Sequence, residues 1–335
     1  KIPIRKKGTT ATYSECLAIA SSRDHQKRQK RMKSKHERLG ARYWKSMLLV
    51  VLCLLIALAA AAFFYVRTRD NLSRLTVLSI GDPMVVWSQD LQSNKFIKIT
   101  IPASAQVDAV GGYGRYSLEA LWKLGAIDSP RWSSGEAGKK NGTLVSDSLE
   151  EALGISIPWY VDVSPGRWLP RTNMPLPLLL SWIWRMRSVK SDRMTEVAIT
   201  PQAALAVQDL PDGTRAQVMD PTRVDALLGT LFEDEAIRRE RLSVTVYNTT
   251  DMPTLGARVG RMLNRVGVFV VRVGNDSPAI EHCTVSGEAA AVKSITARTI
   301  ASIFRCITVV KPSEAGDLDV RVGTRYQARF LSAPR

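Results

Sequence analysis

The sequence predicts an α/β protein tethered by a single N-terminal transmembrane helix. Three observations support this prediction. Residues 46–66 hold a long run free of charge and proline. Short β-prone runs alternate with helical segments through residues 70–225, which predicts an α/β sandwich. Residues 240–330 contain a β-α-β pattern and predict a second, smaller α/β domain. Residues 1–45 form a basic arm ahead of the span.

The membrane span is predicted from Met47–Val66, which holds twenty residues without a charge or a proline. A helix of that length rises roughly 30 Å, the hydrocarbon thickness of a bilayer. Aromatic residues stand at both ends, Tyr43 and Trp44 before the run and Phe63 to Tyr65 within it, as is typical of membrane interfaces. A buried core helix would usually carry a polar stripe, and a cleaved signal peptide would have a shorter apolar region.

Charge predicts the orientation of the span. Residues 1–45 carry fourteen Lys and Arg against three acids, so most of the net charge of +16 precedes the apolar run. Basic flanks stay in the cytoplasm, so we expect a single-pass protein of the cell membrane with its bulk outside. The densest run, residues 23–35, has no interleaved aromatic residue. We expect it to contact anionic lipid headgroups and no nucleic acid.

The four cysteines indicate a structural role outside the cytoplasm. Cys283 and Cys306 both follow the span and could form a disulfide there, although sequence cannot supply the separation that decides whether they are bonded. None of the four has metal-ligand spacing, and the three histidines are isolated from one another. No phosphate-binding glycine-rich loop or nucleophile elbow is present. The sequence therefore assigns no catalytic, cofactor-binding or metal-binding residue.

The first segment outside the membrane is predicted to begin with three strands, two helices and a strand. The second and third strands should form a hairpin. Ser117 could cap the first helix, and Gly125 ends it. The predicted strands and helices lie at residues 75–80, 84–87, 95–101, 116–124, 146–153 and 155–163.

Residues 175–186 are too short to cross a bilayer. They are predicted to pack on the sheet as a helix or a strand, with an exposed face of Trp182 and Trp184 toward lipid or a polyprenyl chain as the alternative. A short helix over residues 201–211 and a longer one over residues 221–240 follow. Asp220 and Pro221 supply the cap and first residue of the longer helix.

The last segment is predicted to start with a strand, a helix and a second parallel strand joined by a right-handed crossover. Asn248 is interpreted as a structural residue that satisfies local backbone groups at the strand-to-helix turn and can cap the helix. The predicted elements lie at residues 242–247, 255–266, 268–273, 292–304, 306–310 and 317–322.

Several of these pieces resemble the LytR–CpsA–Psr cell-envelope family. The stretches SIGDP, KITIP, GGYGRYSLEALWKLG and EEALGISIPWYVDV resemble the opening half of its main domain, and VTVYNTT, the Gly256–Leu263 helix and DLDVRVG resemble its small C-terminal domain. The resemblance implies an N-in, single-pass membrane protein. Family members transfer glycopolymers from polyprenyl-pyrophosphate carriers to the wall. Arginines hold the pyrophosphate and acids hold Mg²⁺, as suits bidentate guanidinium and hard-cation chemistry.

The departures from the family pattern indicate a degenerate first domain. The family's Arg-Asp pair after Ile-Pro is replaced by Ala103-Ser104, and Asp82 matches the family's first acid without the usual Asp-x-Arg. Phosphate could still bind through exposed arginines, although solvated surface positions are favoured for them. These arginines are Arg115, Arg131, Arg167 and Arg171.

The sequence thus predicts a non-catalytic cell-envelope protein that binds cell-wall glycan, a lipid carrier or protein partners, without a cofactor. Two alternatives stay open: an active glycopolymer phosphotransferase that uses Mg²⁺, and a structural subunit of a membrane assembly. The identity of the polymer or partner and the oligomeric state do not follow from the sequence.

Overall fold

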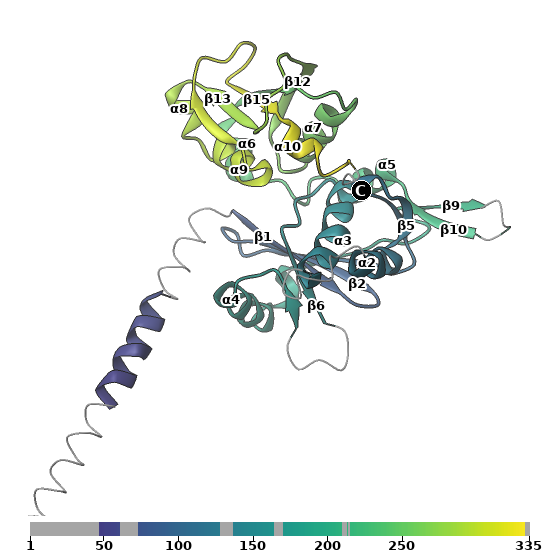
Figure 1. Ribbon diagram of the computed structural model, residues 1–335, viewed down its shortest axis with the longest axis vertical. Coiled ribbons are helices and arrows are strands. Elements are labelled where there is room, and N and C mark those ends of the chain that lie inside the picture. Colours follow the sequence, from purple (N-terminus) through teal and green to yellow (C-terminus); the bar gives the residue numbers. More distant parts are fainter. Residues whose placement is uncertain are drawn as a thin grey trace, which may run out of the picture. The chain divides into compact units, whose positions relative to one another are not determined.

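The computed structural model describes residues 47–60, 73–127, 137–163, 170–209, 213 and 215–331 (Figure 1). The chain divides into two units, residues 1–64 and residues 65–335. In the first unit the described residues form a helix over 47–60. The predicted span reaches beyond it, and residues 46 and 61–66 lie outside the described residues. Within the described part of the chain, no helix is both long enough and apolar enough to cross a membrane.

The second unit begins with a six-stranded sheet in the order β7-β6-β1-β2-β3-β8. The hairpin predicted from the sequence is confirmed, because β2 pairs with β3 in antiparallel register, Val86 opposite Ile99. Strand β1 pairs antiparallel with β2 and parallel with β6. The strands are β1 (Arg74–Ile80), β2 (Met84–Asp90), β3 (Phe96–Ile101), β6 (Trp159–Asp162), β7 (Arg171–Thr172) and β8 (Met194–Ala198).

A second sheet of four strands has the order β5-β4-β10-β9. Its members are β4 (Gln106–Ala109), β5 (Gly114–Ser117), β9 (Leu205–Asp209) and β10 (Arg215–Met219). The helix predicted over residues 201–211 is wrong. Its described residues form a turn followed by β9, which pairs along its whole length with β10, so pairing in the sheet overrides the local helical pattern.

The helices of this half confirm most of the predicted ones. The helices and 3₁₀ turns are η1 (Val110–Gly112), α2 (Leu118–Ile127), α3 (Ala137–Leu153), α4 (Leu176–Arg187), η2 (Ser191–Arg193), α5 (Pro221–Leu228) and α6 (Glu235–Glu240). The single helix expected over 221–240 is two helices, because Gly229 ends α5 and Asp234 caps α6. The predicted cap at Asp220 is confirmed: its Oδ1 accepts from the backbone N–H of Thr222 at 2.9 Å.

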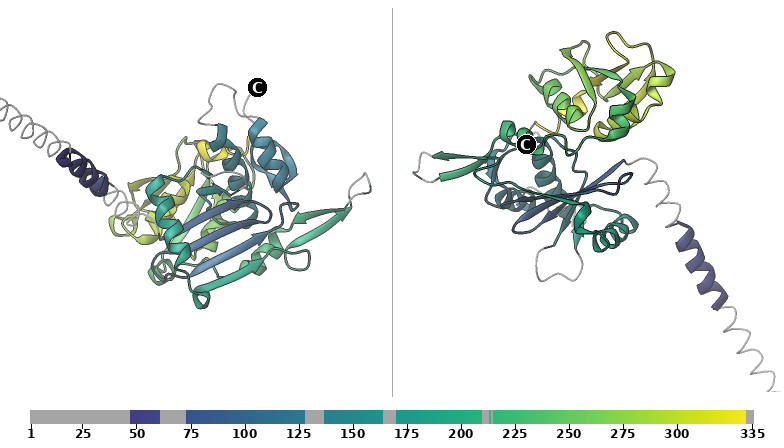
Figure 2. Two further views of the ribbon diagram at one scale, coloured as in Figure 1. Left: turned by 90° about the horizontal axis from the view of Figure 1, so that it is seen from below. Right: turned by 180° about the vertical axis from the view of Figure 1, so that it is seen from behind.

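The six-stranded sheet is covered on both faces (Figures 1 and 2). Side chains alternate along β1, as in any strand. Leu78 and Ile80 join the larger core, which includes α2 and α3. Leu75 and Val77 pack instead against Leu178, Leu179 and Trp182 of α4 in a smaller core. The prediction of a packed helix at 175–186 is therefore confirmed, with Trp182 buried and Trp184 exposed.

The C-terminal half, residues 241–331, has its own five-stranded sheet and its own core. The predicted β-α-β unit is confirmed, since β11 and β12 are parallel neighbours joined by α7. The elements are β11 (Ser243–Asn248), α7 (Leu255–Arg265), β12 (Phe269–Asn275), β13 (Thr284–Gly287), α8 (Ala289–Val292), α9 (Ile295–Phe304), β14 (Ile307–Val310), β15 (Leu318–Val322) and α10 (Thr324–Gln327). We call residues 74–240 the two-sheet half.

Asn248 has the structural role that the sequence suggested. Its Nδ2 donates to the carbonyl oxygen of Met252 at 2.9 Å, and its Oδ1 accepts from the N–H of Thr250 at 3.0 Å. It organises the turn and does not cap α7, whose N-cap position is Thr254.

Candidate functional site

Two of the residues that the family resemblance singled out, Asp82 and Arg171, lie at one edge of the six-stranded sheet, together with Asp162. Asp162 of β6 pairs in register with Arg171 of β7 and with Ile80 at the end of β1. Asp82 follows two residues later and is exposed, whereas Asp162 is buried. Tyr160, on the same strand, has its pKa raised to about 12, mainly because burial disfavours the phenolate.

The remaining predicted arginines do not join this edge. Arg115 lies on β5 in the other sheet, where its Nε donates to Asp108 at 2.9 Å and its Nη1 to Gln208 at 2.8 Å. Arg131 and Arg167 lie outside the described residues. Of the residues singled out from the sequence, only Asp82 and Arg171 are placed at the same edge of one sheet among the described residues.

The described residues at this edge do not fit the Mg²⁺ that the family implies. A protein site for a hard cation gathers several oxygen ligands around one point. Among the residues that the structure describes, no three Asp, Glu, His or Cys side chains are placed to hold a metal ion together. This edge of the sheet therefore supports no chemical step through Mg²⁺.

A cavity of about 810 Å³ lies instead between the two-sheet half and the C-terminal half. We call it the basic cleft, because its lining includes the cationic or titratable side chains of Arg74, Arg305, Arg325, Arg329 and His282. Its lining includes Arg74 and Thr76 at the start of β1 and Trp159 at the start of β6, whereas Asp82 and Asp162 lie at or beyond the far ends of these two strands.

Arg329 closes one wall of the basic cleft. Its Nη1 donates to Glu150 and its Nη2 to Asp147, both at 2.8 Å, and its guanidinium lies over the ring of Tyr326. Burial raises the pKa of both carboxyls, and the charge of Arg329 opposes that rise. Burial alone would lower the pKa of Arg329, but Glu150 and Asp147 raise it above its usual value. The charge of Arg329 is therefore neutralised by two carboxylates of α3, and this ion pair joins the end of the chain to the two-sheet half.

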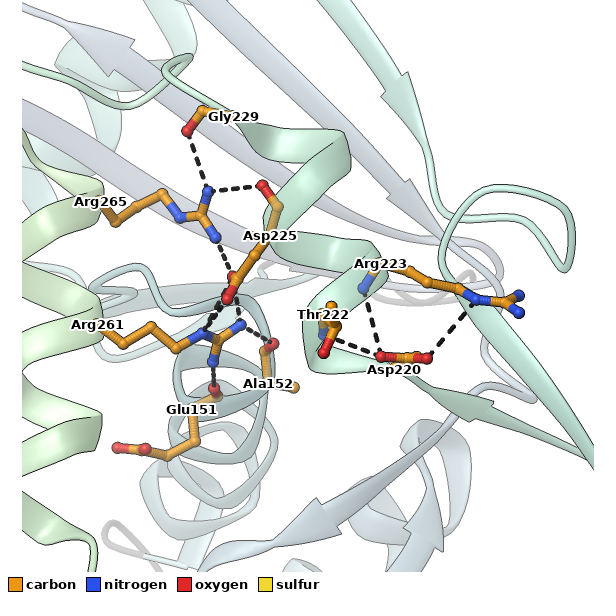
Figure 3. Close-up of polar contacts among 9 residues, drawn as sticks. All are labelled: Glu151, Ala152, Asp220, Thr222, Arg223, Asp225, Gly229, Arg261 and Arg265. Carbon is orange, nitrogen blue, oxygen red and sulfur yellow. Dashed lines mark hydrogen bonds and ion pairs between the residues drawn. The ribbon is translucent and has the colours of Figure 1, made fainter.

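A second group of hydrogen bonds and ion pairs joins α7 to α5 and to the end of α3 (Figure 3). Arg261 donates from Nη1 to the carbonyl oxygen of Glu151 at 2.7 Å and from Nη2 to that of Ala152 at 3.0 Å. Its Nε reaches Asp225 of α5 at 2.9 Å, and Arg265 pairs with the same carboxylate. Two arginines four residues apart thus face one side of α7 and hold the halves together.

Arg265 is the most deeply buried of these cations, with 7% of its surface exposed. Its Nη1 donates to the carbonyl oxygen of Gly229 at 3.1 Å, beyond the end of α5. Burial lowers the pKa of Arg265, and the neighbouring Asp225 opposes that shift. These arginines of α7 serve the contact between the halves, as Figure 3 shows, and are not available to a ligand.

Two arginines of the basic cleft form no ion pair with a described carboxylate and could therefore contact a ligand. Arg305 and Arg325 are exposed, and neither forms an ion pair with a carboxylate among the described residues. Arg325 lies 3.5 Å from His282, Nη1 to Nδ1. Arg305 sits next to Cys306, whose disulfide to Cys283 fixes this end of the cleft.

The rest of the lining suits a polar ligand with some apolar surface. Thr143, Ser302, Trp159 and Phe232 are also among the residues that line the cavity. Arg74 is held against the Phe232 ring, 5.4 Å from its centroid, and burial lowers its pKa. Arginine and hydroxyl side chains can donate hydrogen bonds to phosphate and sugar oxygens, and aromatic rings offer apolar surface beside them.

Sequence reasoning missed the cleft because its residues come from segments that carry no recognisable motif. The end of the chain, GTRYQARF, places Arg325 and Arg329 four residues apart. Residues four apart lie on the same side of a helix, so this spacing was the local sequence feature that indicated a basic surface here. Nothing local indicated that Arg305 would line the same cavity. It lies between the end of α9 and Cys306, whose disulfide partner Cys283 is 23 residues away.

Comparisons with known proteins place the C-terminal half in a family. Residues 241–326 match the LytR cell envelope-related transcriptional attenuator family (LytR_C). A search of the curated proteins gave no match.

Similar solved structures include the transcriptional regulator yvhJ from Bacillus subtilis, 13% identical over 48% of this chain and 95% of that chain, with a TM-score of 0.34. The LytR-CPS2A-psr family protein YwtF (TagT), with bound octaprenyl pyrophosphate lipid, is 12% identical over 47% of this chain and 88% of its own, with a TM-score of 0.30. The C-terminal domain of RV0431 is 24% identical over 25% of this chain and 72% of that chain, with a TM-score of 0.21. Residues 241–326 therefore match the LytR-type C-terminal domain, which confirms the family resemblance of this part of the sequence.

Proposed function

We propose that this chain is an extracytoplasmic cell-envelope protein that binds a phosphate-bearing envelope ligand in the basic cleft and does not transfer it. The ligand is either a phosphorylated wall glycan or the pyrophosphate of a lipid carrier. Residues 47–66 hold the protein in the cell membrane, and residues 1–45 remain in the cytoplasm.

The observation that carries this proposal is the pairing state of the cleft arginines. Arg329 is neutralised by two carboxylates, whereas Arg305 and Arg325 form no ion pair with the described residues. Guanidinium groups bind phosphate oxygens in a bidentate way, and such charged hydrogen bonds are stronger than neutral ones. The cleft is therefore suited to an anionic group flanked by polar and aromatic surface.

Binding without transfer is supported by the residues where the family holds its reacting phosphate. Ala103 and Ser104 follow β3 in place of the family's Arg-Asp pair, and Ala103 is buried. Arg261 and Arg265 are committed to the contact between the halves. A location outside the cytoplasm is supported by the Cys283–Cys306 disulfide, because such bonds persist in oxidising compartments.

The test is direct binding by the full chain in detergent or nanodiscs. The probes are a short polyprenyl pyrophosphate, inorganic pyrophosphate, poly(glycerol phosphate) and an uncharged wall oligosaccharide. We expect the phosphate-bearing probes to bind and the affinity to fall with added salt. Preference for the prenylated probe identifies a lipid carrier, and preference for the polymer identifies a glycan.

Arg305→Gln and Arg325→Gln should each weaken binding by roughly tenfold, about 1.4 kcal/mol, because each removes a charged hydrogen bond. Arg215→Gln is the matched control, since Arg215 is an exposed arginine on β10, away from the cleft lining. Equal binding by all three variants would exclude the cleft as the site.

Two outcomes would replace the proposal. Transfer of the glycopolymer that needs Mg²⁺ and is lost in Asp82→Ala would establish a phosphotransferase acting at the other end of β1. A single protein partner that is captured by the full chain and lost on deletion of residues 1–45, with no phosphate binding, would establish a structural subunit.

A further inference from the structure

Helix α4 is apolar around most of its circumference, yet the sheet covers only one side of it. At 100° per residue, Leu178, Leu179 and Trp182 fall on one side and are buried in the smaller core. Leu176 and Leu180 fall on the other side and are 65% and 58% exposed.

The exposed side is a continuous stripe. Leu176, Leu180 and Trp184 are spaced four residues apart, so they lie above one another along the helix. Trp184 is 72% exposed. Arg187 falls on the same side one turn further on, and Lys190 and Arg193 follow it, all three exposed. Leucines, a terminal tryptophan and flanking cations make up the composition of a helix that lies at a membrane surface.

The chain length places a membrane within reach of this stripe. The apolar run Met47–Val66 ends eight residues before Arg74, the first residue of β1. Seven intervening residues can span at most about 25 Å. Helix α4 packs directly against Leu75 and Val77 of the same strand. If residues 47–66 lie in the bilayer, the strand beneath α4 begins close to its surface.

We propose that the Leu176–Leu180–Trp184 face of α4 lies in the outer surface of an anionic bilayer, with Arg187, Lys190 and Arg193 at the lipid phosphates. The inference rests on the membrane anchoring in the proposed function. It adds a second contact, which fixes the orientation of the extracytoplasmic unit on the membrane. A second copy of the chain is the competing occupant, but Arg187 on the stripe and the two exposed cations that follow it in the sequence favour lipid phosphates over a self-complementary apolar contact.

The experiment uses the full chain with Cys16→Ser and Cys53→Ser, which leaves the Cys283–Cys306 disulfide as its only cysteines. Trp184→Cys carries an environment-sensitive fluorophore, and Leu180→Cys is an independent second position. Val310→Cys is the control, because Val310 is 65% exposed on β14, an edge strand of the five-stranded sheet in the C-terminal half. Each variant is reconstituted in vesicles of phosphatidylglycerol and phosphatidylcholine that contain lipid with a nitroxide high on the acyl chain.

We expect the labels at 184 and 180 to shift to the blue and lose at least about half of their emission to the nitroxide lipid, because an interfacial helix enters the headgroup–acyl boundary. The label at 310 should change by less than about a tenth, since it stays in water. Replacing phosphatidylglycerol with phosphatidylcholine should reduce the quenching.

Flotation of the vesicles separates failure of the contact from failure of the anchor. If the protein floats with the vesicles and the labels at 184 and 180 behave like the label at 310, the contact is overturned and the anchor stands. If disulfide cross-links form between two copies at position 184 without lipid quenching, the occupant is a second copy and the proposal is wrong. If the protein does not float, both the anchor and the contact are overturned.

Discussion

The guanidinium of Arg261 on α7 donates to the carbonyl oxygen of Glu151 on α3 at 2.7 Å, across 110 residues of sequence. The last carbonyl groups of a helix have no partner within the helix, and the helix dipole makes that end negative. Arg261 satisfies two of these carbonyls and neutralises Asp225 at the same time. One side chain of the LytR-type domain therefore caps a helix of the two-sheet half.

Arg261→Ala should lower the free energy of unfolding by about 2 kcal/mol, because it removes charged hydrogen bonds and leaves two half-buried carbonyls unpaired. Urea unfolding of the full chain in detergent, followed by near-ultraviolet circular dichroism, measures the change. Arg239→Ala is the control, since Arg239 is exposed and pairs only with Glu235 of its own helix. A shift of equal size in both variants would contradict the role of Arg261.

Asp225→Ala should be more damaging than Arg261→Ala. Arg265 is buried against Asp225, and removal of the carboxylate leaves a buried guanidinium without its counter-ion, which typically costs about 3–5 kcal/mol. Adding Arg265→Met to Asp225→Ala should recover part of that loss, because the uncompensated charge disappears. The same unfolding measurement tests this, and a double variant less stable than Asp225→Ala would refute it.

Glu240 at the end of α6 caps the first turn of α9. Its carboxylate accepts from the N–H groups of Ile295 and Thr296 at 2.7 and 2.8 Å and from the hydroxyl of Thr296 at 2.6 Å. Burial alone would raise the pKa of Glu240, but these hydrogen bonds lower it below its usual value of 4.5. The folded state therefore binds the proton less tightly than the unfolded state.

The stabilisation from Glu240 should be complete above pH 4.5 and disappear as the pH falls through the lowered pKa of the folded state. At pH 7, Glu240→Gln should be about 1 kcal/mol less stable than the parent chain, as for the loss of a helix cap. The difference should shrink as the pH is lowered below 4.5. Unfolding curves of both proteins across this pH range check the sign, and a difference that grows toward acid would contradict it.

The Cys283–Cys306 disulfide should stabilise the C-terminal half and the basic cleft together. It closes a loop with a sequence separation of 23, for which the chain-entropy relation gives about 3 kcal/mol. Replacing both cysteines with serine should lower the unfolding midpoint and weaken pyrophosphate binding, because Arg305 and His282 are each next to one of the cysteines. Binding that survives unchanged in the folded double variant would separate the disulfide from the cleft.

Much of the fold followed from the sequence because its signals are local. Alternation predicted the β2–β3 hairpin, and the strand–helix–strand pattern predicted β11, α7 and β12. Asp220 followed by Pro221 predicted the start of α5, and the structure confirms it. The segment at 201–211 failed for the opposite reason, since β9 exists only through its partner β10 and carries no decisive pattern of its own.

The candidate site was much less predictable. Arg74 is more than two hundred residues from Arg305 and Arg325 in the sequence, and only the packing of one half against the other brings the three to one cavity. The same limit applied to α4, where two tryptophans stand two residues apart and the local pattern does not say which of them is covered. Trp182 is buried and Trp184 is exposed because the helix has 3.6 residues per turn and the sheet lies on one side.

Gly142 on α3 should be intolerant of any side chain. A Cβ at this position would overlap the ring of Tyr160, which is fully buried on β6 beneath the helix. Glycine to alanine ordinarily stabilises a helix interior by about 1 kcal/mol. Here overpacking should reverse the sign, so Gly142→Ala should destabilise the chain by about 1–3 kcal/mol.

The control is Gly274→Ala on β12, where an added Cβ would meet its nearest neighbours at 3.9 Å, an ordinary contact. It should leave the unfolding midpoint nearly unchanged. Adding Tyr160→Leu to Gly142→Ala should make the second substitution less harmful than it is alone, because the smaller side chain leaves room for the methyl group. If Gly142→Ala stabilises the chain as an unhindered helix position would, α3 does not lie against Tyr160 as closely as the structure has it.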